Sequence, residues 1–521
     1  MPKRRATAPA STRTRSSKRI KFDSFGAPNE TDGLPPAHVA AKQQSGPSST
    51  GASIRSPRRV NGVPTLVSYA AEVFATHFKT LYIPESESLK IDGPAMRKRL
   101  SDLPDTLIPK LLMLLREHCP NYLRPQIITT YFLRGSEIRL SGDLPGVNAA
   151  VLKAIGARHN AGAITSLDLT QLSGVSDQTF AKIVTRLPEL ERLVLRGCSK
   201  AGPLVLEAAA SNCPRLRILN MNYTSPTSRS IFSILLACKE LEVLKIAGVP
   251  KLVDDEILTF TSLRSLKIRL TNLSDSDIAT FFSRCPNLTT LDISFTPIKK
   301  IRIVSPFPPL KKLCLTSTRV AGTNLVNVLK NSPGLEVLYL GAFGETVGAT
   351  PGISNNLTDG LLREVTDALA QCPAIRNVSL AGNPRLGTGG SLGRALHDFI
   401  RRVGRRCETL KLENIPQLRS GDLEGLLRIS DDDQPSPLRY LNVARTGVNG
   451  DAAMFIAACP KLEILDMSAT RFGKEELFTI LDCCPDLVKL DLTSCRSISV
   501  PDRRRFFEVW ESARGDAPGS S

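Results

Sequence analysis

The sequence predicts an α/β fold in which a short strand and a helix alternate many times. A phrase close to Cys-Pro-x-Leu-x-x-Leu-x-Leu recurs along the chain, for example at residues 213–221, 285–293 and 459–467. The central Leu of the phrase returns in most cases after about 22 to 26 residues, the length of one strand plus one return helix. Stacked units of this kind form a right-handed solenoid, a horseshoe with parallel strands on its concave side and helices on its convex side.

The repeated unit is the leucine-rich repeat, and its strand register can be read from the anchor positions. The anchors, all apolar, are Leu167, Leu193, Leu219, Leu244, Leu266, Leu291, Leu313, Leu338, Val378, Leu410, Leu441, Leu465 and Leu490. A degenerate first strand is expected at residues 138–140. We therefore assign residues 138–500 to the solenoid and residues 501–521 to a C-terminal cap helix and tail.

Each unit has the pattern of a strand followed by a helix. The alternation Leu-x-Leu turns two apolar side chains to one face of the strand and leaves the intervening residues on the other face. In the segments that follow, apolar residues recur at three- and four-residue spacing, as in residues 179–184 and 475–481. Ser176, Ser274 and Thr358 stand where helix N-caps are expected.

Several repeats resemble those of known proteins. Residues 193–198 and 490–498 resemble the cysteine-containing repeats of F-box leucine-rich-repeat proteins, and residues 379–387 resemble the inhibitor-type repeat. The chain is thus similar to the ribonuclease-inhibitor-like superfamily over roughly residues 138–499. The resemblance implies a protein-binding horseshoe, although such a fold does not dictate function.

The first sixty residues differ from the rest in composition. They are rich in Ser, Thr, Pro, Ala, Lys and Arg and cannot bury enough apolar area to offset the entropy of ordering. We expect residues 1–62 to be a disordered basic tail. Twelve Lys or Arg stand against Asp23, Glu30 and Asp32 in this segment, so it carries +9 of the net charge of +18.

Two basic groups in this tail, separated by residues 6–17, match a bipartite nuclear-import signal. They are Arg4, Arg5, Lys18, Arg19 and Lys21. We therefore expect a nuclear location, with the cytoplasm as the alternative. A solvated tail that binds any polyanion, nucleic acid included, is a second reading. A mitochondrial transit peptide is a third, but it would need a bulky apolar stripe that the tail lacks.

Twelve cysteines are present, and no run approaches the length of a membrane span. Six cysteines recur at the same helix-to-strand corner: Cys213, Cys238, Cys285, Cys372, Cys459 and Cys484. A small buried thiol suits that corner, and equivalent positions one repeat apart need not pair. We expect reduced, structural cysteines, an intracellular protein and no membrane partner.

Residues 63–137 are expected to be helical and to act as a cap on the first repeat or as an adaptor-binding segment. The run 103–115 opens with Leu-Pro, which resembles the start of an F-box, but Pro109 interrupts the motif's first helix and its later Trp is absent. Solenoid ends need a cover. A cap and a contact with a Skp-type or elongin-type adaptor of a cullin-type ubiquitin ligase both remain open.

Nothing in the sequence predicts catalysis, a cofactor or a metal. The five histidines are scattered and no Cys-x-x-Cys pair occurs. The Gly-rich turn at residues 387–393 lacks the Gly-Lys-Ser/Thr ending of a phosphate loop. We therefore expect a protein that is not an enzyme.

The residues between the apolar strand positions predict a basic stripe on the concave face. Its members, the predicted partner-binding residues, are Arg192, Arg196, Lys245, Lys267, Arg269 and Lys312. Lys and Arg steer and hydrogen-bond anionic groups, so an acidic or phosphorylated protein partner is expected. Two long strand-to-helix loops, residues 341–356 and 381–391, offer a second surface for a partner.

The sequence thus favours a non-enzymatic protein-recognition solenoid. Its most concrete version is a substrate receptor of a cullin-type ubiquitin ligase, acting in protein catabolism. The alternative is a nuclear scaffold or GTPase-regulatory leucine-rich-repeat protein without ligase attachment.

Overall fold

The computed structural model describes residues 54–55, 65–82, 93–248, 259–303, 305–344, 357–389, 394–428 and 434–515. The predicted import signal and most of the predicted tail lie outside these residues. Ile54–Arg55 forms strand β1, which pairs antiparallel with β15 (Lys489–Asp491). These two residues of the predicted tail pair with the sheet because the edge of a sheet offers backbone groups that a segment of any composition can pair with.

One sheet runs through the described part of the chain. Strands β2 to β15 are parallel to their neighbours and follow chain order, and β1 joins at the β15 edge. The remaining strands are β2 (Glu137–Ser141), β3 (Ser166–Thr170), β4 (Arg192–Val194), β5 (Ile218–Asn220), β6 (Val243–Lys245), β7 (Ser265–Lys267), β8 (Thr290–Asp292), β9 (Lys312–Cys314), β10 (Val337–Tyr339), β11 (Asn377–Ser379), β12 (Thr409–Lys411), β13 (Tyr440–Asn442) and β14 (Ile464–Asp466). This topology confirms the predicted α/β leucine-rich-repeat solenoid.

The predicted register is also confirmed. Leu193 of β4 lies opposite Leu167 on one side and Leu219 on the other, and each later anchor lies opposite the next. The anchors form a continuous ladder in which no side chain is more than 1% exposed. The degenerate first strand exists as well, since Ile138 of β2 lies opposite Leu167.

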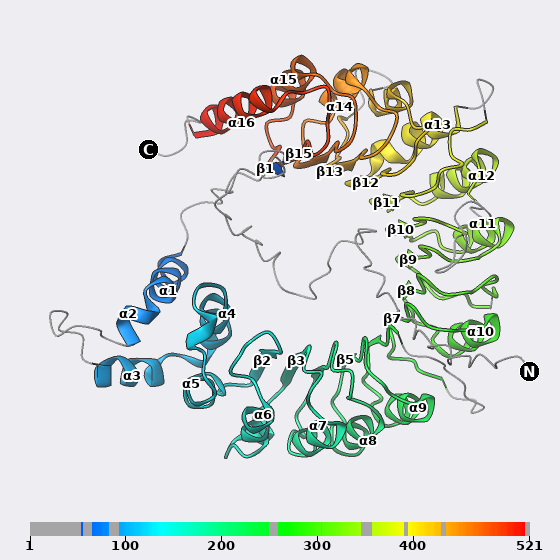
Figure 1. Cartoon of the computed structure of the whole chain (residues 1–521). Coiled ribbons are helices and arrows are strands. Elements are labelled where there is room, and N and C mark those ends of the chain that lie inside the picture. Colours follow the sequence, from blue (N-terminus) through cyan, green and yellow to red (C-terminus); the bar gives the residue numbers. More distant parts are fainter. Residues whose placement is uncertain are drawn as a thin grey trace, which may run out of the picture. The chain divides into compact units, whose positions relative to one another are not determined.

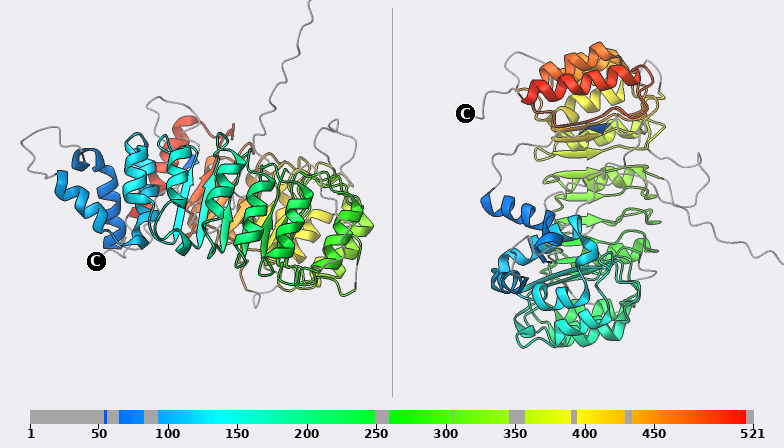
Figure 2. Two further views of the ribbon diagram at one scale, coloured as in Figure 1. Left: turned by 90° about the horizontal axis from the view of Figure 1, so that it is seen from below. Right: turned by 60° about the vertical axis from the view of Figure 1, so that its left-hand side comes forward.

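The helices follow the strands and lie on the outer side of the sheet (Figures 1 and 2). They are α6 (Ala149–Gly156), α7 (Asp177–Val184), α8 (Pro203–Asn212), α9 (Ser228–Ala237), α10 (Asp275–Arg284), α11 (Gly322–Lys330), α12 (Asp359–Ala370), α13 (Ala395–Arg402), α14 (Ala453–Ala457) and α15 (Lys474–Cys483), with short turns η4 (Ala161–Ala163), η5 (Gly404–Arg406), η6 (Ser420–Leu426) and η7 (Gly450–Ala452). Ser274 and Thr358 accept N-cap hydrogen bonds as predicted, whereas the Ser176 hydroxyl bonds the Thr179 hydroxyl instead.

The cysteines are free thiols, as predicted. At the corners, several thiols reach back to the preceding repeat: Cys213 Sγ donates to the Leu187 carbonyl and Cys238 Sγ to the Cys213 carbonyl, both at 3.3 Å. Burial raises the pKa of the Cys213 and Cys285 thiols to about 12. These side chains therefore stay protonated and act as small apolar groups with a weak donor.

The segment before the first repeat is helical. It contains α1 (Leu66–Thr76), α2 (Phe78–Tyr82), α3 (Gly93–Asp102), η1 (Asp105–Leu107), α4 (Ile108–His118), η2 (Pro120–Tyr122), α5 (Pro125–Ile127) and η3 (Ile128–Phe132). Pro109 does not interrupt a helix, because it lies in the first turn of α4, where its missing N–H costs nothing. Leu111 and Leu115 of α4 are buried, and α4 contacts both α1 and β2.

The C-terminal end is covered by α16 (Val500–Gly515). Its Phe506, Phe507 and Trp510 are buried, and the Phe506 ring packs edge-on against Phe478 of α15, with centroids 5.3 Å apart. Both ends of the solenoid are thus sealed by helices that bury apolar side chains. Within the described residues, no helix combines the length and the apolar character needed to cross a membrane.

Candidate functional site

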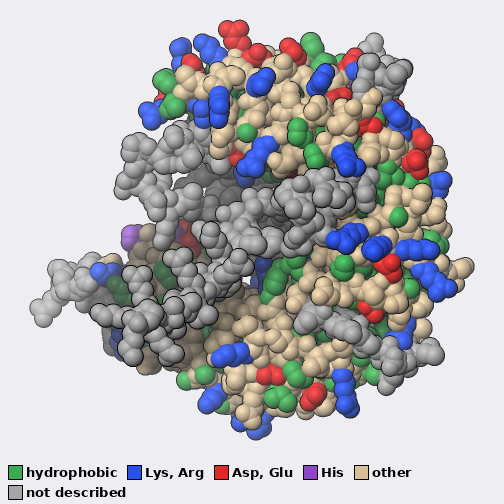
Figure 3. Space-filling view, turned by 45° about the vertical axis from the view of Figure 1, so that its right-hand side comes forward, with side chains coloured by type: hydrophobic (Ala, Val, Ile, Leu, Met, Phe, Trp, Pro, Cys, Tyr) green, Lys and Arg blue, Asp and Glu red, His purple; other side chains and the backbone are tan. Residues whose placement is uncertain are grey.

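The inner surface of the sheet is built from the two residues that flank each anchor. Because the strands are in register, these residues form rows that cross the sheet from β2 to β15. On the face that Figure 3 shows, blue Lys and Arg side chains are interspersed with red Asp and Glu side chains.

Lys245 of β6 lies opposite Lys267 of β7, in the middle of the predicted stripe. The Lys245 side chain is buried by its neighbours, with 6% of the residue exposed, and Lys267 is half-buried. Arg196 follows β4 and is exposed, and Lys312 of β9 is half-buried. The register thus brings Lys245 and Lys267 together and places Arg196 and Lys312 on strands to either side.

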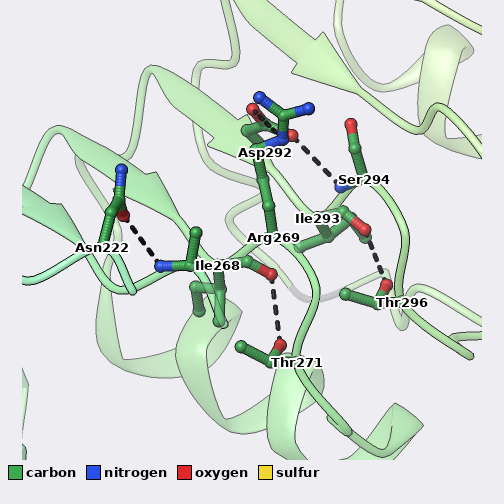
Figure 4. A network of polar contacts seen from close by, with 9 residues as sticks. Asn222, Ile268, Arg269, Thr271, Asp292, Ile293, Ser294 and Thr296 are labelled. Atoms are coloured by element: carbon green, nitrogen blue, oxygen red, sulfur yellow. Dashed lines mark hydrogen bonds and ion pairs between the residues drawn. The ribbon is translucent and has the colours of Figure 1, made fainter. Parts of the chain in front are cut away.

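Two arginines of the predicted stripe are held by acidic partners. Arg192 Nη2 lies 3.8 Å from Asp168 Oδ2 on the preceding strand. Arg269 Nε lies 3.6 Å from Asp292 Oδ2, and the two side chains lie beside each other in Figure 4. The stripe is therefore less basic than the sequence suggested, since both acids occupy flanking positions on their own strands.

The surroundings of Arg269 are rigid. Its guanidinium carbon lies 5.4 Å from the centre of the Phe295 ring. The second carboxylate oxygen of Asp292 accepts a hydrogen bond of 3.1 Å from the Ser294 N–H. The Thr271 and Thr296 hydroxyls close the adjoining turns by donating to the carbonyls of residues 268 and 293 (Figure 4). Arg269 thus contacts an acidic side chain and an aromatic ring of the following repeat.

Lysine and tyrosine side chains alternate farther along the concave face, and of these residues only Lys312 was a member of the predicted stripe. Lys312 Nζ lies 5.4 Å from the centre of the Tyr339 ring, and Lys411 Nζ lies 5.9 Å from the same ring and 5.3 Å from that of Tyr440. The sequence register places each of these residues facing outward, but the spacing of the repeats is irregular here. Only the packed strands show which side chains meet.

The strands near the C-terminal end of the sheet carry acids. Asp466 of β14 lies opposite Asp491 of β15, and burial raises the pKa of Asp466, with the Asp491 charge acting in the same direction. Burial likewise raises the pKa of Glu413, which follows β12. The later strands of the concave face thus carry buried acids as well as lysines such as Lys411 and Lys489.

The predicted rim loops are partly described. Residues 345–356 and 390–391 lie outside the described residues, so a partner-binding role for these loops stays a prediction. In the Gly-rich turn, the N–H groups of Gly387 and Gly389 donate to the Asp359 carboxylate at 2.7 and 2.8 Å. These groups are therefore already bonded within the protein.

No cluster of three or more His, Cys, Asp or Glu side chains suited to a metal ion occurs among the described residues. His118, for example, faces Glu72, with Nε2 2.8 Å from Oε1. The concave face presents charged side chains and aromatic rings on a parallel sheet, which are features suited to contacts with another protein.

No family model matches the chain. Over 170 residues the chain is 27% identical to the F-box/LRR-repeat protein 4 of Bos taurus, a match that covers 30% of this chain and 27% of that protein. The chain resembles the leucine-rich-repeat superfamily. The match spans only about a quarter of the relative's length.

Two solved structures are also similar. A chain of the yeast Rad7 and Elc1 complex is 16% identical, with a TM-score of 0.45 over 78% of this chain and 94% of that chain. An internalin of Listeria monocytogenes is 14% identical, with a TM-score of 0.31 over 67% of this chain and 93% of that chain.

Proposed function

We propose that this chain is a non-enzymatic recognition solenoid whose concave face binds an acidic or phosphorylated segment of a protein partner. The observation that carries the proposal is the position of Lys245 opposite Lys267. Neighbouring strands lie about 4.8 Å apart, so one anionic group can contact the side chains of both lysines through charge-assisted hydrogen bonds. Arg196 and Lys312 add charge of the same sign on nearby strands.

The test is a double charge reversal, Lys245→Glu with Lys267→Glu, in the full chain. Proteins recovered with the parent chain should be lost from this variant, and their binding to the parent should weaken with salt. The matched control reverses two exposed helix lysines, Lys182→Glu with Lys330→Glu, and changes the net charge equally. If both variants retain every partner of the parent chain equally, the stripe takes no part in partner binding.

The finer proposal is a substrate receptor of a cullin-type ubiquitin ligase. The similarity to a protein named for an F-box and leucine-rich repeats supports it. The apolar run 103–115 is a poor site for an adaptor, because Leu111, Leu112, Leu114 and Leu115 are already buried in the cap. Helix α1 is the better candidate, since Leu66, Val67, Tyr69 and Val73 are 82%, 50%, 62% and 40% exposed.

Co-purification of a Skp-type or elongin-type adaptor with the full chain tests the ligase proposal. We expect Leu66→Glu with Tyr69→Glu to abolish adaptor binding while leaving the fold intact, because both side chains face solvent. Met454→Glu is the control, since Met454 of α14 is 63% exposed and lies on another helix. If neither adaptor binds the parent chain, the burial of the 103–115 run favours the alternative, a nuclear scaffold or GTPase-regulatory protein in which α1 to η3 only cap the solenoid.

A further inference from the structure

Four side chains from β9, β10, β12 and β13 form a group on the concave face, here named the lysine–tyrosine cluster: Lys312, Tyr339, Lys411 and Tyr440. Tyr339 lies between the two lysines in strand order. Ser379 of β11 lies opposite Tyr339 on one side and opposite Lys411 on the other. Together with Ser379, the lysine–tyrosine cluster therefore occupies the consecutive strands β9 to β13.

Both ammonium groups of the cluster converge on one ring. Lys312 Nζ and Lys411 Nζ lie 5.4 and 5.9 Å from the centre of the Tyr339 ring. Tyr440 provides a second ring, 5.3 Å from Lys411 Nζ. Ring faces attract cations, but the same convergence brings two positive charges close together.

The position of Lys411 is electrostatically costly. The residue is 6% exposed, and burial lowers the pKa of its ammonium. Lys312 lowers this pKa further, and Glu413 raises it. Tyrosine rings offset part of the cost of desolvating an ammonium group, but they do not remove its repulsion by a second cation.

Glu413 is the acidic group beside the cluster. Its Oε2 atom is buried and accepts no hydrogen bond from the described part of the chain, and burial raises the pKa of its carboxyl group. The Glu413 charge acts on Lys411 and raises its pKa, so Glu413 competes with an incoming anion for this ammonium group.

We propose that Lys312 and Lys411, arranged around the Tyr339 ring, form a subsite for one phosphomonoester group on a side chain of a protein partner. A phosphomonoester carries nearly two negative charges at neutral pH and three acceptor oxygens, so separate oxygens of one group can accept hydrogen bonds from both ammonium groups beside the Tyr339 ring. The Ser379 hydroxyl between the two strands supplies a further donor. The biological occupant rests on the function proposed above, but the subsite itself can be measured without any partner.

The experiment titrates the full-length chain with phenyl phosphate at low salt and follows binding by calorimetry. Benzoate serves as the matched probe with one charge. We expect Lys312→Met and Lys411→Met each to weaken phenyl phosphate binding about tenfold, the loss expected for one charge-assisted contact. Lys489→Met, which removes an exposed lysine of β15 on the same sheet, should leave the affinity unchanged. Glu413→Gln should strengthen binding, because it removes the competing carboxylate.

Circular dichroism melting checks the fold of each variant. If Lys411→Met is unstable, Lys312→Met alone is used to test the subsite. Equal affinity of the parent and both lysine variants for phenyl phosphate would overturn the subsite, as would equal affinity of the parent for benzoate. An equal loss in Lys489→Met would show that only net charge matters. If the subsite fails while charge reversal at Lys245 and Lys267 still releases partners, the proposed function stands without it. If the subsite binds phenyl phosphate but charge reversal at Lys245 and Lys267 releases no partner, the phosphate site stands and the proposed role of the stripe is contradicted.

Discussion

The carboxylate of Asp177 accepts a hydrogen bond of 2.8 Å from the backbone N–H of Gly202, in the next repeat. The same carboxylate accepts bonds from the N–H groups of Leu204 and Val205 in the first turn of α8. A side chain at the start of α7 therefore caps the helix that follows it in the solenoid. Asp275 does the same for the backbone after β8, through the N–H groups of residues 299 and 300.

Replacing Asp177 with Ala should lower the free energy of unfolding by about 1–3 kcal/mol, because the N–H groups of Gly202, Leu204 and Val205 at the start of α8 lose their acceptor. Urea unfolding followed by circular dichroism measures the change. Asp482→Ala, at an exposed position of α15, should stay within about 0.5 kcal/mol of the parent. A similar loss of unfolding free energy in both variants would mean that the hydrogen bonds between Asp177 and the next repeat do not stabilise the fold.

Leu219 and Leu291 are 0% and 1% exposed in the anchor ladder. Leu→Ala at either position should cost about 2–5 kcal/mol, since the cavity would lie between sheet and helices. Arg196→Ala, on the exposed face beside the same sheet, should be nearly neutral in the same urea titration. A loss below about 1 kcal/mol at both leucines would contradict the register described above.

Thiol chemistry should separate the cysteines of the native chain. Cys483 is exposed, whereas Cys213 and Cys285 are fully buried and burial raises the pKa of their thiols to about 12. The thiolate is the reactive form, so a thiol reagent at pH 8 should label Cys483 rapidly and the corner cysteines only after unfolding. Cys483→Ser should remove the fast phase, and a fast phase that persists would place another reactive thiol at the surface.

The same pKa shifts predict that alkaline pH weakens the fold. The Cys285 thiol ionises near its usual pKa of 9.0 when the chain is unfolded, but at about 12 in the folded chain. Between these values the unfolded chain binds fewer protons, so the free energy of unfolding falls as pH rises. Cys285→Ala should reduce this slope in urea titrations between pH 8 and 11. An unchanged slope would show that the thiol is not held protonated.

The predicted import signal can be tested in cells without structural knowledge of the tail. Lys18→Ala with Arg19→Ala and Lys21→Ala removes charges that an acidic receptor groove would bind. Nuclear accumulation of a fluorescent fusion should fall, while a triple Ala variant of Lys461, Lys474 and Arg496 should retain it. Equal distribution of parent and tail variant, or absence of the parent from the nucleus, would remove the proposed nuclear location.

The repeat pattern was sufficient to predict the anchors, the strand register and the corner cysteines. These features depend on periods within one repeat: a two-residue alternation on a strand and a helix return of nearly constant length. Leu219 is buried because it occupies the repeating anchor position, which the stacked neighbouring units cover.

Features that join different repeats or distant segments required the tertiary structure. Strand β1 pairs with β15 across almost the whole sequence, and the 103–115 run is buried by contacts with α1 and β2. The convergence of Lys312 and Lys411 on Tyr339 depends on how side chains from three different strands are oriented in the packed sheet. Arg192 and Arg269 seemed to be stripe cations until the packed strands placed Asp168 and Asp292 beside them. Electrostatic partners are set by distance in space, and a local sequence pattern contains no information about distances between strands that packing alone brings together.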